Sequence, residues 1–235
     1  KFRQAGITEL ISMYCLWLAM YHPNKKINII SIKDTVAKKV LKKIKFMYKN
    51  LPSYLQEPII NGRTGEFGSV STIEFANGSI IESIPTSDQA GRSESLSLLV
   101  IDEAAIVRWA STIWASAFPT LSTGGAAIVN STPYGVGNFF HGAWVDAIAG
   151  GNPLNPIRLY WQMHPDRDQK WYEEMSTALG PKRTAQEIDG DFLSSGNTVF
   201  DLVDIKAIEE CLSDYPIINT RLKGQYKEFN EPDPN

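Results

Sequence analysis

The sequence predicts an α/β protein whose mostly parallel sheet is flanked by helices. Short strand-like runs alternate with helical segments along the chain, the order from which parallel sheets are built. The run at 98–101 is continuously apolar rather than alternating, as is typical of a strand buried on both faces. With 235 residues, the chain can hold one such domain, or one domain and a small appendage.

The first half of the chain supplies helices, a strand and a hairpin. Helix-forming residues with an apolar face end at His22-Pro23-Asn24, a typical helix stop signal. An isoleucine-rich run after this stop favours a strand, and Asn77-Gly78 between two further runs favours a β-hairpin. The expected elements are helix 8–21, strand 26–32, helix 31–49 and hairpin strands 71–75 and 79–84.

The second half continues the alternation of strands and helices. A polar loop at 85–95 leads into the apolar strand 98–101. Apolar runs and amphipathic stretches predict the remaining elements. These are strands 126–130 and 157–161 and helices 136–148, 168–179, 181–192 and 204–212.

The composition is that of a folded globular protein. Hydrophobic residues make up 43% and charged residues 21% of the chain, and no run approaches the ~20 apolar residues of a membrane span. Cys15 and Cys211 have no metal-ligand spacing and indicate no disulfide framework. Because the net charge is −3, a nucleic acid would have to bind a local basic patch, such as residues 38–46 or Lys182-Arg183. Both patches are more typical of a solvated helix face.

Asp102 and Glu103 directly follow the apolar strand 98–101. They would lie at the carboxyl end of a parallel strand, where open α/β sheets form their ligand crevices. In a nucleoside triphosphatase, an aspartate at such a place holds the water shell of Mg²⁺, and the next acid orients the attacking water. An ordinary strand followed by a polar turn fits the same pattern.

A nucleotide site of this kind needs a phosphate-binding loop before its first helix, and the start of the chain is the candidate. In the usual pattern G-x-x-x-x-G-K-[S/T], Gly6 and Thr8 fall in place, but Ile7 occupies the lysine position. Lys1 stands where the first glycine is expected, and its side chain can reach back over the phosphates. Arg3 adds a second cation within reach of the γ-phosphate. Alternatively, Lys1 and Arg3 are ordinary surface charges on a loop.

Further motifs occur on both sides of the Asp-Glu pair. The loop R-Q-x-G-x-T precedes it, Arg92 lies ten residues before Asp102, and Asn130-Ser131-Thr132-Pro133-Tyr134-Gly135 ends the next strand. In this order and spacing, the motifs resemble the ATPase domain of phage terminase large subunits, the motors that package viral DNA. The resemblance covers roughly residues 1–200. Some members of that family carry the loop lysine at the position of Lys1.

The resemblance implies which residues bind Mg²⁺-ATP. Lys1, Gln4, Gly6 and Thr8 would hold the nucleotide, with its phosphates over the amino end of the first helix. Thr8 would ligate Mg²⁺ directly, and Asp102 would do so through water. ATP and Mg²⁺ are therefore the cofactors we expect.

The resemblance also implies the catalytic and coupling residues. Glu103 would orient the attacking water, and Arg3 would neutralise charge on the γ-phosphate. Arg92 would be a finger that reaches the nucleotide of a neighbouring subunit. The residues that would couple phosphate loss to movement are Asn130, Ser131 and Thr132.

By the same resemblance, we expect a P-loop NTPase fold of the ASCE/RecA-like type. Its core would be residues 1–165, with the first strand truncated, and residues 166–235 would form a small linker subdomain leading to an absent nuclease domain. Because the chain begins with Lys1 rather than methionine and ends in a polar, proline-containing stretch, we interpret it as an internal fragment of a larger protein.

The resemblance implies that ATP hydrolysis powers the translocation of double-stranded viral DNA into a procapsid in the host cytoplasm. The expected partners are double-stranded DNA, the terminase small subunit, the portal protein and further copies of the chain in a ring, with no membrane. One alternative is a degenerate, non-hydrolysing assembly module, which Ile7 favours. Another is a different P-loop DNA translocase such as a helicase, which would carry a second RecA-like half.

Overall fold

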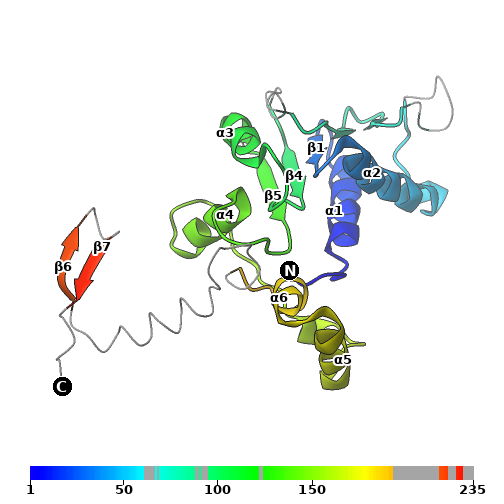
Figure 1. Ribbon diagram of the computed structural model, residues 1–235. Helices are drawn as coiled ribbons and strands as arrows, with labels where there is room; N and C mark the ends of the chain where they lie inside the picture. The colour runs from blue at the N-terminus through cyan, green and yellow to red at the C-terminus, as the bar shows by residue number, and fades with distance from the viewer. Residues whose placement is uncertain are drawn as a thin grey trace, which may run out of the picture.

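The central element is a five-stranded sheet with the strand order β2-β3-β1-β4-β5 (Figure 1). The computed structural model describes residues 1–60, 67, 69–87, 90, 95–121 and 124–192, together with the backbone of a separate hairpin, β6 (Ile217–Arg221) and β7 (Tyr226–Phe229). The sheet strands are β1 (Lys26–Ile30), β2 (Thr72–Glu74), β3 (Ile80–Ser83), β4 (Leu98–Asp102) and β5 (Ala126–Asn130). All neighbouring strands pair in parallel except β2 and β3, which form the predicted hairpin. The expected fold class is confirmed.

Helices cover both faces of the sheet because β4 is apolar on both sides. Leu98 and Val100 pack with α1 (Ile7–Tyr21) and α2 (Asp34–Lys49). Leu99 and Ile101 point the other way and pack with α3 (Ala110–Leu121) and Phe140 of α4 (Phe139–Ile148). Every residue of β4 is buried. The continuous apolar run therefore reflects a strand between two helical layers.

One helix in the described part was not predicted from the sequence. α3 buries Ala110, Ile113, Ala117 and Leu121, which share one face of the helix. Two of these four residues are alanines, and Pro119 lies in the last turn, so the apolar periodicity is weak and a helix breaker interrupts it.

Three predictions for the second half are wrong or lie outside the described residues. Residues 157–160 pair with no strand of the described sheet, and a short 3-10 helix, Trp161–Met163, follows them. In place of the helix predicted at 181–192, the structure has α6 (Pro181–Thr184) and a π-helical turn, Ala185–Asp189. This turn ends before 192 because Gly190 adopts a left-handed φ of 68°. The helix predicted at 204–212 lies outside the described residues.

A small aromatic cluster joins the start of the chain to the segment after β5. Phe2, Trp161 and Ile188 are buried against one another. The rings of Trp161 and Tyr172, the latter on α5 (Gln169–Leu179), stack with centroids 4.9 Å apart. Figure 1 accordingly shows the first residues lying next to α6. The domain boundary expected between residues 165 and 166 stays a prediction.

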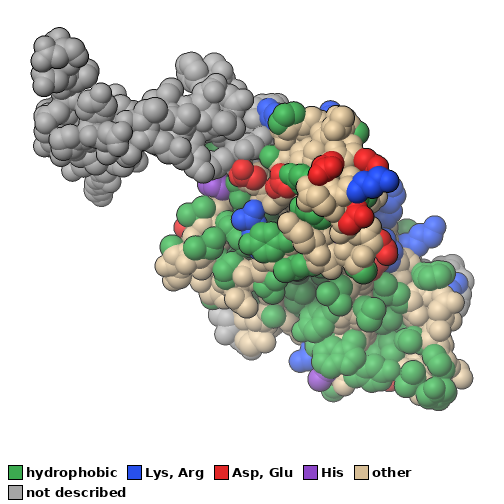
Figure 2. Space-filling view, turned by 90° about the horizontal axis from the view of Figure 1, so that it is seen from below, with side chains coloured by type: hydrophobic (Ala, Val, Ile, Leu, Met, Phe, Trp, Pro, Cys, Tyr) green, Lys and Arg blue, Asp and Glu red, His purple; other side chains and the backbone are tan. Residues whose placement is uncertain are grey.

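The outer face of α1 leaves large hydrophobic side chains exposed. Their spacing of three and four residues places them on one side of the helix. They are Leu10, Met13, Tyr14, Trp17 and Tyr21. Hydrophobic side chains cover much of the molecular face seen from below (Figure 2). Exposed apolar areas of this kind are typical of surfaces that contact other protein segments.

Truncation of a buried side chain on α2 should test the packing of this helix on the sheet. Ile44 is fully buried in the cluster that joins α1, α2 and β4. Ile44→Ala should lower the free energy of unfolding by about 2–5 kcal/mol, because it removes buried methyl groups and leaves a cavity. The measurement is urea denaturation followed by circular dichroism.

Phe46→Ala is the control for this prediction, because Phe46 lies on the same helix but is 67% exposed. Its effect should stay within about 0.5 kcal/mol. Equal losses in the two variants would contradict the packing described for α2.

Candidate functional site

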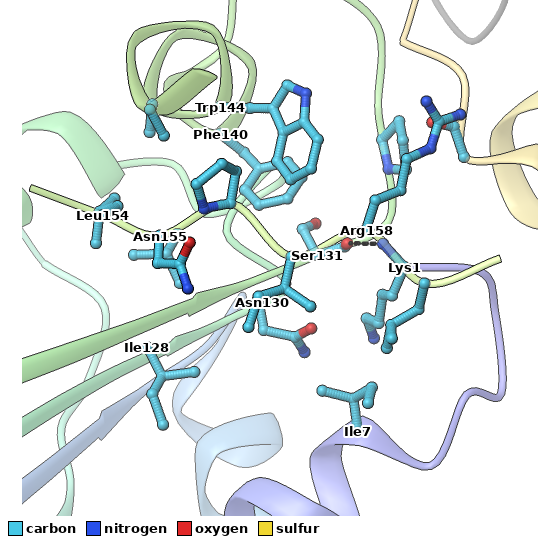
Figure 3. Close-up of a pocket in the computed structure, with 18 of the residues that line it drawn as sticks. Lys1, Ile7, Ile128, Asn130, Ser131, Phe140, Trp144, Leu154, Asn155 and Arg158 are labelled. Carbon is cyan, nitrogen blue, oxygen red and sulfur yellow. Dashed lines mark hydrogen bonds between the residues drawn. The ribbon is translucent and has the colours of Figure 1, made fainter. Parts of the chain in front are cut away.

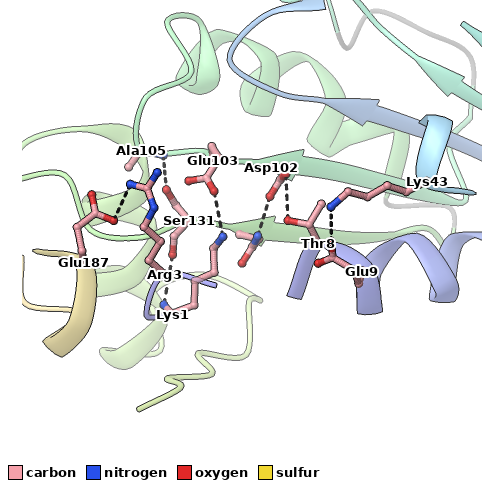
Figure 4. Close-up of polar contacts among 11 residues, drawn as sticks. Lys1, Arg3, Thr8, Glu9, Lys43, Asp102, Glu103, Ala105, Ser131 and Glu187 are labelled. Atoms are coloured by element: carbon pink, nitrogen blue, oxygen red, sulfur yellow. Dashed lines mark hydrogen bonds and ion pairs between the residues drawn. The ribbon is translucent and has the colours of Figure 1, made fainter. Parts of the chain in front are cut away.

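The candidate site lies where the carboxyl ends of β4 and β5 meet the start of α1 (Figure 4). In the parallel register, Asp102 of β4 pairs with Asn130 of β5, so both side chains leave the sheet at the same edge. Thr8, in the first turn of α1, approaches this edge from the helix layer. Three segments that are distant in sequence thus deliver polar groups to one place.

Asp102 is the most deeply buried acid of the site, with a relative exposure of 4%. Asn130 Nδ2 donates to Asp102 Oδ1 at 2.7 Å, and Thr8 Oγ1 donates to Asp102 Oδ2 at 3.4 Å. Burial raises the pKa of Asp102, against the opposing effects of the Asn130 hydrogen bond and the Lys1 charge. The protein therefore holds a carboxylate in a place that disfavours its negative charge.

Glu103 faces the lysine that the sequence placed at the entrance of the loop. Lys1 Nζ lies 3.0 Å from Glu103 Oε1, and the two side chains are only 11% and 27% exposed. The backbone of Glu103 adopts a φ of 55°, a left-handed conformation that L-residues other than glycine rarely take. Such local strain is often found at functional sites.

Hydrogen bonds to the end of β5 hold the turn after Glu103 in place. The Ala104 N–H donates to the Asn130 carbonyl at 3.1 Å, and the Ala105 N–H donates to Ser131 Oγ at 3.2 Å. Ser131 and Thr132 are themselves buried. Through these hydrogen bonds, a movement of the segment after β5 would displace the turn that carries Glu103.

The loop of residues 1–6 leads into an uncapped helix. Gly6 is the N-cap of α1 with a φ of 69°, and the described residues show no side-chain hydrogen bond that caps this helix start. A Cβ built on Gly6 would meet no atom within 4 Å, so the space above this backbone is open. Gln4, which is exposed, also has a positive φ, of 61°. Free N–H groups and the helix dipole make this end of α1 suitable for an anion.

The structure brings together most of the residues predicted for the site, but it places Arg3 differently. Lys1, Thr8, Asp102, Glu103 and Asn130 are linked by the contacts above. Arg3 points toward Glu187, with Nη1 3.2 Å from Glu187 Oε2 (Figure 4). Arg92 lies outside the described residues.

An apolar groove of about 470 Å³ opens beside Lys1 and runs along β5 (Figure 3). Ile7 and Ile128 line it from the helix and the sheet, and Trp144 lines it from α4. Ile7 is thus a wall residue of the groove, which explains in part why an apolar side chain stands at the usual lysine position. The volume of the groove falls in the range of small-molecule pockets.

Several charged residues near the site were not singled out from the sequence. Arg158 lines the groove near Lys1 and donates from Nη2 to the Asp189 carbonyl at 3.0 Å. Arg167 and Glu187 both contact the loop of residues 1–6. The contacts of these residues were not predicted, because each contact joins positions far apart in the sequence.

Among the residues that the structure describes, no three histidine, cysteine, aspartate or glutamate side chains cluster as a metal centre. In the same residues, no helix is both long and apolar enough to cross a bilayer.

Comparison with known proteins identifies related chains, although no family model matches. The chain is 29% identical to the terminase large subunit of Thermus phage G20c and 28% identical to that of Thermus virus P23-45. Each match covers 48% of this chain and 26% of the relative. The matched region is therefore about a quarter of the length of these curated relatives.

Solved structures extend the comparison to most of the described fold. The large terminase ATPase domain of Thermus phage P74-26 superposes with a TM-score of 0.58 at 19% identity, covering 81% of this chain and 86% of that domain. The chain resembles phage terminase large subunits in sequence and a large-terminase ATPase domain in fold. The large terminase of another thermophilic bacteriophage, in complex with ATP-γ-S, gives a TM-score of 0.61 at 15% identity, over 80% of this chain and 45% of that one. The resemblance expected from the motifs is confirmed.

Removal of the Asp102 charge should stabilise the protein without nucleotide. Because burial raises the pKa of Asp102, stability is lost as the pH rises through that pKa and the group ionises. Asp102→Asn should therefore raise the melting temperature by a few degrees at pH 7.5. The gain should shrink as the pH falls and the wild-type carboxyl becomes protonated. Thermal melts across this pH range provide the measurement.

Asp166→Asn is the matched control, since Asp166 is exposed and the substitution removes the same charge. It should shift the melting temperature by about 1 °C or less, both at pH 7.5 and at lower pH. A lower melting temperature for Asp102→Asn at pH 7.5 would show that its hydrogen bonds outweigh its buried charge.

Proposed function

We propose that this chain is the ATP-hydrolysing part of a terminase large subunit, which drives double-stranded viral DNA into a procapsid. One observation carries the proposal: Lys1, Thr8, Asp102, Glu103 and Asn130 meet beside the uncapped start of α1. A phosphate site, a cation site and a water-orienting acid are the parts that phosphoryl transfer needs. The likeness to large terminases, one of them crystallised with ATP-γ-S, supports the same function.

The donor set fits Mg²⁺. Thr8 Oγ1 and Asp102 Oδ2 are hard oxygen ligands 3.4 Å apart. The pKa of Asp102 is raised because burial disfavours its negative charge, and a divalent cation would stabilise that charge. Thr8 and Asp102 would hold the ion, which when bound neutralises charge on the β- and γ-phosphate oxygens.

The residues of the chain would then act in distinct ways. The N–H groups around Gly6 and the first turn of α1 bind the phosphates. The phosphates attract Lys1, which releases Glu103 from its ion pair. The freed Glu103 accepts a hydrogen bond from the attacking water and orients it. Arg3 and Arg92 add positive charge at the γ-phosphate.

Phosphate loss would be transmitted through the end of β5. Asn130 touches Asp102, and Ser131 holds the turn after Glu103 through Ala105. When the γ-phosphate leaves, Lys1 is free to return to Glu103, and the turn and the segment after Asn130 adjust together. Thr132, buried next to Ser131, belongs to the same segment.

The partners proposed for the whole protein are double-stranded DNA, the terminase small subunit and the portal protein, with the chain assembled in a ring and acting in the host cytoplasm. They are the partners that the resemblance to terminase large subunits implies. A nuclease activity would belong to a separate C-terminal domain.

A non-hydrolysing assembly module is the alternative that a specific observation favours. Ile7 offers no charge at the usual lysine position and serves as a wall of the groove. The contact between Lys1 and Glu103 argues against this alternative, because it supplies a cation within the site.

Glu103→Gln should abolish ATP turnover while ATP still binds. The amide keeps the size of the side chain but cannot accept a proton or orient water as a carboxylate does, so kcat should fall about 10²–10⁴-fold. Phosphate release and binding of fluorescent ATP by the full-length protein are the two measurements. Glu173→Gln, which changes an exposed residue of α5, should leave both values unchanged. Undiminished turnover in Glu103→Gln would refute the role of this acid.

Lys1→Ala in the full-length protein tests whether this lysine replaces the missing one. The variant should lower kcat/KM for ATP at least about tenfold, because no buried cation at position 1 would stabilise the negative charge of the transferred phosphoryl group. Lys39→Ala removes an exposed lysine of α2 and should have no effect on turnover without DNA. Wild-type activity in Lys1→Ala would show that another residue stabilises the negative charge of the phosphates. Absence of turnover in the wild type would favour the assembly module.

A further inference from the structure

A buried hydroxyl group lies at the same edge of the sheet as the candidate site. Ser31 directly follows β1 and is 0% exposed. Its Oγ has no hydrogen-bond partner among the residues that the structure describes. Buried hydroxyl groups are nearly always hydrogen-bonded, because an unpaired one has lost its contacts with water and gained none in return. The Ser31 hydroxyl is therefore a candidate for contact with a ligand.

The register of the sheet places Ser31 next to Asp102. The last paired residues of β1 and β4 are Ile30 and Ile101, so Ser31 and Asp102 are the next residue of each strand. On the other side of β4, Asn130 of β5 pairs with Asp102. The carboxyl ends of three neighbouring parallel strands thus carry a serine, an aspartate and an asparagine in one row.

The alternation of side chains along β1 places the Ser31 side chain on the α1 side of the sheet. Successive residues of a strand point to opposite faces. Ile29 packs in the cluster that contains α1 and α2, whereas Ile30 packs in the cluster on the other face. Ser31 follows Ile29 by two positions and shares its face. Thr8 approaches Asp102 from this same side.

Ser31 and Asp102 are neighbours that do not hydrogen-bond to each other. The two carboxylate oxygens of Asp102 accept from Asn130 and Thr8 instead. Neighbouring strands lie about 4.8 Å apart, which is longer than a hydrogen bond, and the serine side chain is short. One water molecule spans such a distance with two hydrogen bonds. Mg²⁺ keeps several of its waters when it binds to a protein, so the ion would bring a water of this kind.

We propose that Ser31 is a positioning residue of the Mg²⁺ site. This inference rests on the function proposed above. When Mg²⁺-ATP is bound, Ser31 Oγ accepts a hydrogen bond from a water of the Mg²⁺ shell, on the side of Asp102 that faces away from Asn130. The hydroxyl thereby gains the partner that it lacks in the protein alone. Ser31 orients the water shell of the ion and touches neither the nucleotide nor the attacking water.

Ser31→Ala should have opposite effects on the free protein and on nucleotide binding with Mg²⁺. Without nucleotide, removal of an unpaired buried hydroxyl should raise the melting temperature by about 1–4 °C. With Mg²⁺, calorimetry of the full-length protein should show that ATP-γ-S binds about three- to tenfold more weakly than to the wild type, because one hydrogen bond is lost. In EDTA, the affinity should change less than about twofold, because the hydrogen bond requires the water shell of the ion.

Ser79→Ala is the matched control, because Ser79 is also 0% exposed but its hydroxyl is paired. Ser79 Oγ accepts from the Lys25 N–H at 3.0 Å and donates to the His22 carbonyl at 2.9 Å. Ser79 precedes β3 and therefore lies at the opposite end of the parallel strands from the site. This variant should lower the melting temperature by a few degrees and leave the affinity for ATP-γ-S unchanged, both with Mg²⁺ and in EDTA.

Three results for Ser31→Ala would overturn the inference and leave the proposed function intact. They are unchanged binding of ATP-γ-S with Mg²⁺, equal weakening with Mg²⁺ and in EDTA, and a melting temperature below that of the wild type. The last result would show that the hydroxyl stabilises the fold itself. Absence of ATP-γ-S binding to the wild type with Mg²⁺ would overturn the proposed function and this inference with it.

Discussion

The site depends on the parallel register between β4 and β5. Because Asp102 pairs with Asn130, the two strands end together and place an acid and an amide 2.7 Å apart at one edge. All other groups of the site are positioned relative to this pair. Thr8 reaches Asp102 from α1, and Ser131 continues from Asn130 to hold the turn that carries Glu103. A shift of one residue in this register would turn Asp102 toward the opposite face of the sheet.

The burial on both faces of β4 explains why this register is well defined. Leu98 and Val100 fill one helical layer while Leu99 and Ile101 fill the other, so a shift of one residue would exchange the side chains that each layer packs against. The same burial raises the pKa of Asp102 and makes its charge unfavourable in the protein alone. The fold thus accepts a destabilising carboxylate at a place where a cation and phosphates would make it favourable.

The sequence was informative where local patterns determine the outcome. The apolar run ending in Asp102 and Glu103, and the strand ending in Asn130, predicted the elements and their common edge. The short helical and π-helical turns at 181–189 were not predicted, because the left-handed Gly190 determines where they end. The contact of Arg3 with Glu187 was also not predictable, since the two residues lie 184 positions apart. Charges are visible in a sequence, but the partners of those charges depend on tertiary structure.

The left-handed backbone of Glu103 has a consequence for how this protein would respond to selection in the laboratory. Glycine adopts a φ of 55° freely, whereas glutamate does so at a cost of about 1–2 kcal/mol. Glycine at position 103 would relieve this strain, but it would also leave the buried Lys1 ammonium without its carboxylate partner. In a library sorted only for heat resistance, position 103 and Lys1 should therefore vary together.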